Sequence, residues 1–231
     1  MPSITTGRPL DEHGDSTDGP ALELDSDGRA ATLFSESPHA LASGPGSGTW
    51  SVMLDDFGAD RPEMVVWLAP DAAELPAHVH RTREETFEAL TGELTVVADG
   101  ETHRLAPGES HTVDPGTEHY FRNHTDGFVA FRVKLPWAKT ATTQYTVFGC
   151  DHEGKFGGDD EYGEPGPMHA LVLSEAVSEE THLAIAPAFV QRAAWATLGR
   201  LAKAMGHSAV EEQFLDDDYW RETVEQPKLG E

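Results

Sequence analysis

The sequence predicts a mainly β fold, a barrel or a sandwich of two sheets, followed by an α-helical extension. Between residues 64 and 133, short runs rich in Val, Thr and Phe alternate with Gly, Pro and Asp turns, a spacing typical of all-β sandwiches and barrels. The Asp99-Gly100 pair between two of these runs is a hairpin signal. Beyond Pro167 the apolar spacing becomes helical. A parallel α/β fold is disfavoured because crossover helices between the strands are missing.

With 231 residues, the chain has room for one barrel and an extension. Residues 1–28 are rich in Gly, Pro, Asp, Ser and Thr with few large apolar side chains, so we expect a flexible acidic lead. Residues 29–140 should form the β-barrel, and residues 141–166 a linker rich in Gly, Asp and Pro. Residues 167–231 should form a C-terminal helical extension.

The expected strands are short and end at turns such as Thr91-Gly92 and Pro107-Gly108. In chain order they are Thr49–Leu54, Met64–Leu68, Glu85–Leu90, Leu94–Ala98, Thr102–Leu105, His111–Val113, His119–Arg122 and Val129–Val133. In the extension, one helix should begin at Pro167 and a second at Pro187, since Pro is favoured in the first helical turn. Gly206 should end the second helix after Met205.

Two motifs within the strands carry the chemistry. The first contains His78-Val-His80, then Glu85 and Gly92. Two residues two apart on a strand point to the same face, and imidazole and carboxylate are natural ligands of divalent first-row metals. The second motif runs Gly108-Glu-Ser-His-Thr-Val-Asp114-Pro115-Gly116-Thr-Glu-His119-Tyr-Phe-Arg-Asn123.

Together these motifs resemble the two signatures of the cupin superfamily, over roughly residues 46–140. One departure is Asp114, where the family usually has Pro, at a turn rather than at a ligand position. The resemblance implies a double-stranded β-helix, or jelly-roll, barrel that binds one divalent transition metal. The ligands that it implies are His78, His80, Glu85 and His119. The segments around Gly166–Glu175 and Ala188–Gly199 resemble the tails of small, uncharacterised cupins with a C-terminal helical extension.

Glu84 is the alternative to Glu85. Glu85 fits the spacing of the family signature to Gly92, and neighbouring side chains on a strand point to opposite faces. Only one of the two can therefore face the interior together with Phe87. We expect Glu85 to do so, and Phe87 and Phe121 to fill the barrel.

Three imidazoles and one carboxylate occupy four positions of an octahedral ion and leave two for water, substrate or dioxygen. The ligand set does not choose among Fe, Mn, Ni, Cu, Co and Zn. The resemblance implies a metalloenzyme that acts on a small organic molecule, as an oxygenase or isomerase. The alternative is a non-catalytic protein that binds or senses a small ligand and contacts a partner through its helical tail. No residue stands out as a catalytic acid or base. A further alternative to both functions is a barrel that no longer binds metal.

The charge balance and the single cysteine limit the partners. The chain has 41 acidic and 16 basic residues, a net charge of −25, which repels phosphate backbones and disfavours nucleic-acid binding. Acidic residues spread along a chain with few Lys are typical of proteins from salt-loving cytoplasms, so we expect stability to fall in low salt.

No apolar run is long enough to span a membrane, and the N-terminus is polar. Cys150 alone fits a reducing cytoplasm, and we expect it to be inert.

The expected helix after Pro187 has an unusual charge pattern. There is no acidic residue between Glu180 and Glu211. The apolar stripe, defined as Val190, Ala194, Leu198, Leu201 and Met205, lies within roughly 80° of arc, opposite the basic residues Arg192, Arg200 and Lys203. We expect the stripe to pack inward and the basic side to meet the barrel or a second subunit of a homodimer. An anionic membrane surface is the alternative, disfavoured by the net charge.

Overall fold

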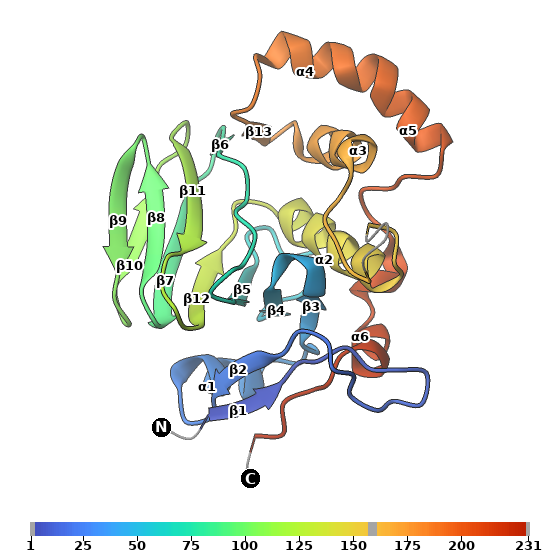
Figure 1. Ribbon diagram of the computed structural model, residues 1–231. Helices are drawn as coiled ribbons and strands as arrows, with labels where there is room; N and C mark the ends of the chain where they lie inside the picture. Colours follow the sequence, from blue (N-terminus) through green and yellow to red (C-terminus); the bar gives the residue numbers. More distant parts are fainter. Residues whose placement is uncertain (1–2, 157–160, 230–231) are drawn as a thin grey trace.

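The computed structural model describes residues 3–156 and 161–229, and its centre consists of two facing β-sheets with helices on one side (Figure 1). The six-stranded sheet, ordered β10-β7-β12-β5-β4-β3, contains β3 (Ala42–Gly44), β4 (Thr49–Met53), β5 (Glu63–Leu68), β7 (Glu85–Thr91), β10 (Ser110–Val113) and β12 (Val129–Lys134). The five-stranded sheet, ordered β13-β6-β11-β8-β9, contains β6 (His78–His80), β8 (Leu94–Ala98), β9 (Glu101–Leu105), β11 (Glu118–Asn123) and β13 (Thr181–Leu183).

The expected strands from residue 49 to residue 133 are confirmed to within one residue or two. Asp99 and Gly100 both have positive φ, at 49° and 78°, as a type I′ hairpin requires. The barrel, however, is not closed: no pairing among the described strands joins the two sheets. At the β9 and β10 edges, the rings of His103 and His111 stack with 3.9 Å between their centroids. Side chains rather than backbone hydrogen bonds therefore bridge the sheets there.

The prediction of a mainly β fold needs correction, because the fold is mixed. The helices are α1 (Arg29–Glu36), α2 (Ala138–His152), α3 (Pro167–Val177), α4 (Ala188–Ala194), α5 (Arg200–Ala204) and α6 (Asp217–Thr223), with a π-helical turn at Trp195–Gly199 and 3₁₀ turns at Pro45–Ser47 and Glu212–Leu215. None of the described helices is long and apolar enough to cross a membrane.

The N-terminal segment differs from the expected flexible lead. β1 (Ser3–Thr6) and β2 (Leu22–Asp25) form an antiparallel pair, and the side chains of Leu22 and Leu24 are buried in the main core. The indole nitrogen of Trp50 donates to the carbonyl of Gly7 over 2.7 Å. Two alternating leucines are enough to dock the pair, although the composition of the whole segment is polar. Residues 1–2 of the expected lead lie outside the described residues.

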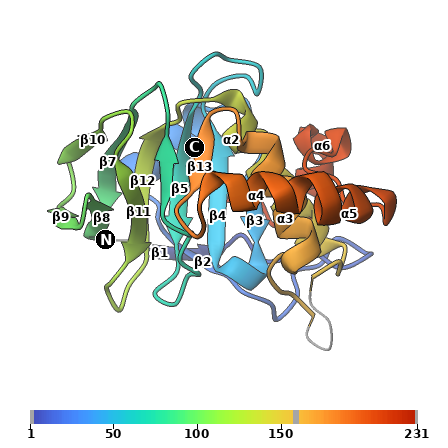
Figure 2. The ribbon, with the colours of Figure 1, turned by 90° about the horizontal axis from the view of Figure 1, so that it is seen from above.

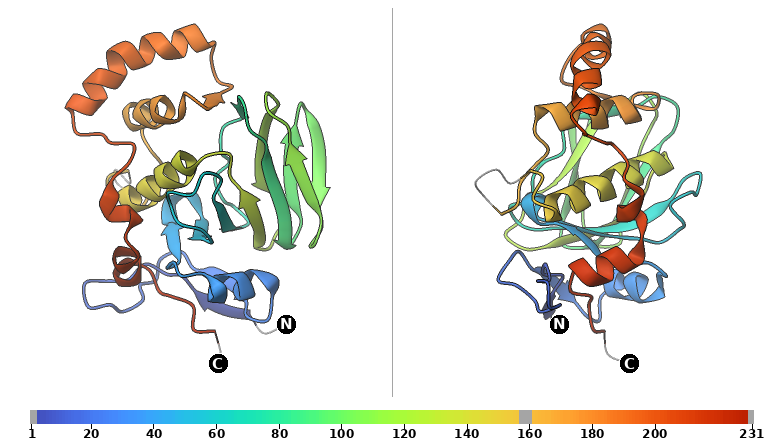
Figure 3. Two further views of the ribbon diagram at one scale, coloured as in Figure 1. Left: turned by 180° about the vertical axis from the view of Figure 1, so that it is seen from behind. Right: turned by 90° about the vertical axis from the view of Figure 1, so that its right-hand side faces the viewer.

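The expected linker at 141–166 also differs, because its first half belongs to α2. Ala141, Tyr145 and Phe148 are buried, and they recur at the spacing of one helical face. Viewed from behind, α2 lies beside β3 and β4 (Figure 3). Residues 157–160 of the expected linker lie outside the described residues.

Both expected helices of the extension are confirmed, with Pro167 in the first turn of α3 and Gly206 directly after the last turn. Residues 230–231 of the extension lie outside the described residues. The segment from α4 to α5 lies across α3 and extends away from the sheets (Figures 1 and 2). Its buried residues are Gln191, Trp195, Gly199 and Ala202.

The inward packing expected for the apolar stripe is therefore wrong. Exposed fractions are 43% for Val190, 50% for Leu198, 52% for Leu201 and 64% for Met205. The segment packs mainly on α3, through Trp195, whose indole nitrogen donates to the Ser174 hydroxyl over 3.0 Å. A helix supported on one side buries only the face that meets its support, so the larger apolar side chains stay uncovered.

Candidate metal centre

The four residues expected as ligands come together between the two sheets. One potential ligand atom from each of His78, His80, Glu85 and His119 lies within 4.8 Å of the others. Exposed fractions are 2% for His80, 3% for Glu85 and 1% for His119, whereas His78 is partly exposed. The group as a whole is buried, and His78 is the least buried of its four residues.

Strand geometry explains this convergence. His78 and His80 alternate with Val79 on β6, so both rings lie on one face. β11 pairs antiparallel with β6 and sets His119 directly opposite His78. Glu85 begins β7 in the other sheet and reaches the imidazoles from the opposite side. Three imidazoles therefore come from one sheet and the carboxylate from the other.

Hydrogen bonds at Nδ1 orient the three rings. The Nδ1 of His78 donates to the carbonyl of Pro76, and the Nδ1 of His119 donates to the carbonyl of Thr117, each over 3.0 Å. A carbonyl can only accept, so both rings carry a proton on Nδ1. Their Nε2 atoms are then directed at the group, as metal-ligating histidines require.

His80 differs because its Nδ1 lies 2.9 Å from the hydroxyl of Thr181, which is 101 residues away. Thr181 was missed in the sequence analysis. No local pattern connects it to His80, because the contact depends on β13 pairing with β6.

The carboxylate of Glu85 contacts two of the rings. Its Oε2 lies 3.0 Å from Nε2 of His119 and 3.4 Å from Nε2 of His80. Burial tends to raise the pKa of Glu85, but the hydrogen bonds from His119 and His80 outweigh it and lower the pKa well below its ordinary value. Burial likewise tends to lower the pKa of His119, but the hydrogen bond to Glu85 outweighs it and raises the pKa.

The donor set fits a divalent cation. The buried Glu85 carboxylate faces Nε2 of His119 and Nε2 of His80, and buried charges are stable only when they are paired or bind a metal. A dication can replace the proton on Nε2 of His119 and take the lone pairs of three imidazoles. This buried group can therefore hold a metal ion.

Glu84 and Glu85 lie on opposite sides of the strand, as expected. The side chain of Glu84 is partly exposed and forms an ion pair with Arg61 over 3.3 Å. We predict that Glu85→Gln loses most of its bound metal, because the amide removes the negative charge, whereas Glu84→Gln retains it. Metal content per chain after dialysis measures both variants. Equal loss in the two would contradict this assignment.

The aromatic side chains behind the group fill the interior. Phe87 and Phe131 are fully buried, and the ring of Phe121 lies 5.4 Å from Phe87 and 5.0 Å from Phe131 between centroids. The expectation that Phe87 and Phe121 pack inside is confirmed. The ring of Phe87 lies 6.4 Å from that of His119 between centroids, so apolar side chains border the group there.

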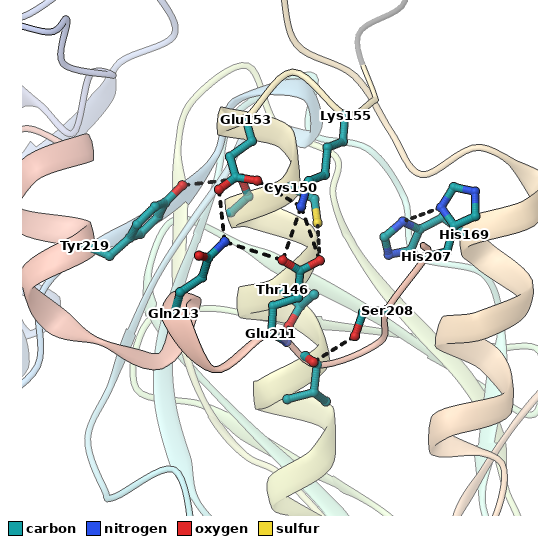
Figure 4. Close-up of polar contacts among 12 residues, drawn as sticks. Thr146, Cys150, Glu153, Lys155, His169, His207, Ser208, Glu211, Gln213 and Tyr219 are labelled. Carbon is teal, nitrogen blue, oxygen red and sulfur yellow. Dashed lines mark hydrogen bonds and ion pairs between the residues drawn. The ribbon is translucent and has the colours of Figure 1, made fainter. Parts of the chain in front are cut away.

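Cys150 lies in a separate polar cluster, drawn in Figure 4. Its Sγ is 3.7 Å from a carboxylate oxygen of Glu211, which also pairs with Lys155. Burial raises the pKa of the Cys150 thiol to about 12, so the reactive thiolate is scarce. His152 bonds to Ser43 instead, over 3.0 Å. The expectation of an inert cysteine is consistent with this arrangement.

We predict that the metal-free protein loses stability as the pH falls from 6.5 towards 4. Burial lowers the pKa of both His78 and His152 from 6.5 to about 4. Between pH 6.5 and 4 these two imidazoles bind protons in the unfolded chain but stay mostly neutral in the folded chain, so a fall in pH favours unfolding. Urea unfolding at several pH values measures the slope, and His78→Gln and His152→Gln should each flatten it. A slope that neither variant changes would contradict the prediction.

Comparison with known proteins agrees with this geometry. Residues 64–133 match the family described as Cupin domain. No curated protein matches the chain.

Solved structures similar to parts of the chain include two cupins and a predicted decarboxylase. A sugar phosphate isomerase of the cupin superfamily from Silicibacter pomeroyi is 28% identical, with 44% of this chain and 71% of that chain covered and a TM-score of 0.36. An RmlC-like cupin from Shewanella frigidimarina is 23% identical, with coverages of 43% and 85% and a TM-score of 0.36. A predicted oxalate decarboxylase from Thermotoga maritima is 19% identical, with coverages of 43% and 96% and a TM-score of 0.38. Likeness at this level assigns neither substrate nor reaction.

Proposed function

Residues 64–133 are a cupin domain, and on that premise we propose that the chain is a mononuclear metalloenzyme acting on a small organic molecule, of the oxygenase or isomerase type. His78, His80, Glu85 and His119 are the proposed ligands. The observation that carries the proposal is the convergence of three imidazoles and one buried carboxylate within 4.8 Å.

An enzyme is favoured over a structural metal site when the bound ion is six-coordinate, because the four donors then leave positions open. Structural sites are closed by protein ligands, whereas catalytic sites keep a position for water or substrate. Four donors leave two positions on an octahedral ion, and in this proposal a small molecule approaches on the side of His78, the least buried of the four residues. When bound, the metal can polarise a carbonyl or enolate oxygen or lower the pKa of a bound water.

The residues around the ligands have defined tasks in this proposal. The carbonyls of Pro76 and Thr117 hold the protons on Nδ1 of His78 and His119. The Glu85 carboxylate balances the positive charge at the centre, and Phe87 excludes water behind it. The donor set suits Fe, Mn, Ni, Cu, Co and Zn alike, so all six belong in the test.

The test uses the full chain reconstituted with each ion in turn. Oxygen uptake is measured with a panel of catechols and enols, and isomerisation of the same compounds is followed by NMR. We expect turnover with at least one ion, and loss of turnover in His80→Ala. Metal binding without turnover across the panel would instead favour the alternative, a non-catalytic protein that binds or senses a small ligand.

We also propose that the apolar stripe is covered by a second copy of this chain. Arg192 and Arg200 lie on the side of the segment opposite the stripe, are exposed, and form no ion pair among the residues that the structure describes. A chain with a net charge of −25 offers a complementary acidic surface. The segment is also free of carboxylates from residue 181 to residue 210, so two copies meet there with least repulsion.

Light scattering on a sizing column tests this contact. The double variant Leu198→Glu with Leu201→Glu should shift a dimer to monomer and keep the circular dichroism of a folded chain, because both side chains are exposed in the single chain. Leu75→Glu is the matched control, since Leu75 is equally exposed, at 52%, but lies outside the helix. A monomeric wild type, or salt-sensitive binding of the wild type to anionic liposomes, would overturn the proposal.

A further inference from the structure

We propose that Thr181, which lies outside the cupin domain, is a positioning residue for His80, so that the C-terminal extension completes the metal centre. This inference rests on the proposed role of His80 as a metal ligand. It gives β13 a function at the metal centre, although β13 lies outside the two cupin motifs.

The contact follows from strand pairing. β13 is one edge strand of the five-stranded sheet and pairs antiparallel with β6, with Thr181 directly opposite His80. Side chains of opposed residues lie on the same face of the sheet. The Thr181 hydroxyl consequently lies 2.9 Å from Nδ1 of His80, and only 8% of Thr181 is exposed. Water is therefore a poor competitor for this hydrogen bond.

His80 is the one proposed imidazole ligand whose partner comes from a distant part of the chain. The Nδ1 atoms of His78 and His119 bond to carbonyls within their own motifs. The backbone carbonyl of His80 itself accepts from the amide of Gly116 over 2.7 Å, which fixes the backbone but leaves the ring free to turn. The orientation of the His80 ring thus depends on Thr181 at Nδ1 and on Glu85 at Nε2.

A hydroxyl also differs from a carbonyl in what it can do. It donates as well as accepts, so Thr181 suits both states of His80. When Nε2 ligates, Nδ1 carries the proton and donates to Oγ1 of Thr181. Without metal, Thr181 can donate to Nδ1 while Nε2 donates to Glu85, 3.4 Å away. Thr181 therefore permits His80 to exchange its proton for a metal without losing a partner.

The position of the hydroxyl is fixed from both ends of β13. The amide of Arg81 donates to the carbonyl of Glu180 over 2.9 Å, and the amide of Ala184 donates to that of Ala77 over 2.7 Å. The side-chain amide of Gln191 in α4 donates to the carbonyls of Leu183 and Ala186, over 2.8 and 2.6 Å. The extension thereby holds β13, and with it Thr181, against β6.

The test compares Thr181→Val, which keeps the shape and removes the hydroxyl, with Thr181→Ser, which keeps the hydroxyl. Metal affinity is measured by chelator competition with Zn²⁺ and Co²⁺ on the full chain. Loss of a hydrogen-bond partner of a ligating histidine costs about 10- to 100-fold in affinity, so we expect a loss of this size in Thr181→Val and recovery in Thr181→Ser. The absorption spectrum of bound Co²⁺ should change in Thr181→Val alone.

A second readout needs no metal. In the metal-free protein, ¹⁵N imidazole spectra should show changed His80 signals in Thr181→Val and unchanged His78 signals. Wild-type affinity in Thr181→Val, or equal losses in the Val and Ser variants, would overturn the positioning role while leaving the metal site intact. Failure of the wild type to bind metal, or retention of metal in His80→Ala, would instead overturn the proposed ligand set, and this inference with it.

Discussion

Protein purified without chelator is expected to carry close to one divalent ion per chain, and His80→Ala or His119→Ala is expected to lose most of it. Both rings are buried and contact Glu85, so removing either takes away a quarter of the donor set and leaves a buried carboxylate short of a partner. A metal that binds only the folded chain adds about 4 kcal/mol to the free energy of unfolding at a thousandfold excess over Kd. Elemental analysis and thermal unfolding measure the two effects.

The control for this experiment is His207→Ala. His207 contacts His169, 3.4 Å away between Nδ1 atoms, in the polar cluster of Figure 4 rather than at the candidate metal centre. It should keep the wild-type metal content. A wild type that contains no metal, even after reconstitution with all six ions, would contradict the ligand assignment.

Replacing Trp220 by Ala should destabilise the whole fold by about 3–5 kcal/mol, the usual cost of truncating a large buried aromatic side chain. Trp220 is fully buried in the main core. Its ring meets that of Tyr145 edge to face at 5.7 Å between centroids, and its indole nitrogen donates to the carbonyl of Phe214 over 2.8 Å. Urea unfolding should show one transition at a lower midpoint.

The neighbouring Arg221→Ala variant is the control. Arg221 is exposed and pairs with Asp218, and changes at such surface positions are usually within about 0.5 kcal/mol. Equal midpoints for Trp220→Ala and the wild type would show that the C-terminal segment is not part of the core. For the same reason, deletion of residues 187–231 should unfold the protein, because it removes Phe214, Trp220 and Val224 from the core.

The strands and the four proposed ligands could be predicted because their signals are local. A period of two residues sets His78 and His80 on one face and separates Glu85 from Glu84, whatever lies further along the chain. The Asp99-Gly100 turn is equally local, since its backbone angles depend on those two residues. The facing sheets and the candidate metal centre follow from these short-range rules together with the family resemblance.

The termini could not be predicted from local signals. Gly7 and Leu10 hydrogen-bond to Glu225 and Thr223 at the other end of the chain, and both termini lie at the base of the molecule in Figure 1. A polar composition averaged over 28 residues hides the two leucines that enter the core. The helical spacing of Ala141, Tyr145 and Phe148 was a usable signal, but the Gly, Asp and Pro content further along the expected linker obscured it.

The sequence by itself determined which neighbouring side chains share a face, because backbone geometry fixes their direction, and its resemblance to the cupin signatures implied the set of His78, His80, Glu85 and His119. Only the tertiary structure decided what covers each face. It left the apolar stripe of the α4–α5 segment exposed, opened the barrel between β9 and β10, and brought Thr181 to His80 across 101 residues. Burial and pairing across such distances depend on which segments meet in space, and periodicity along the chain carries no information about that.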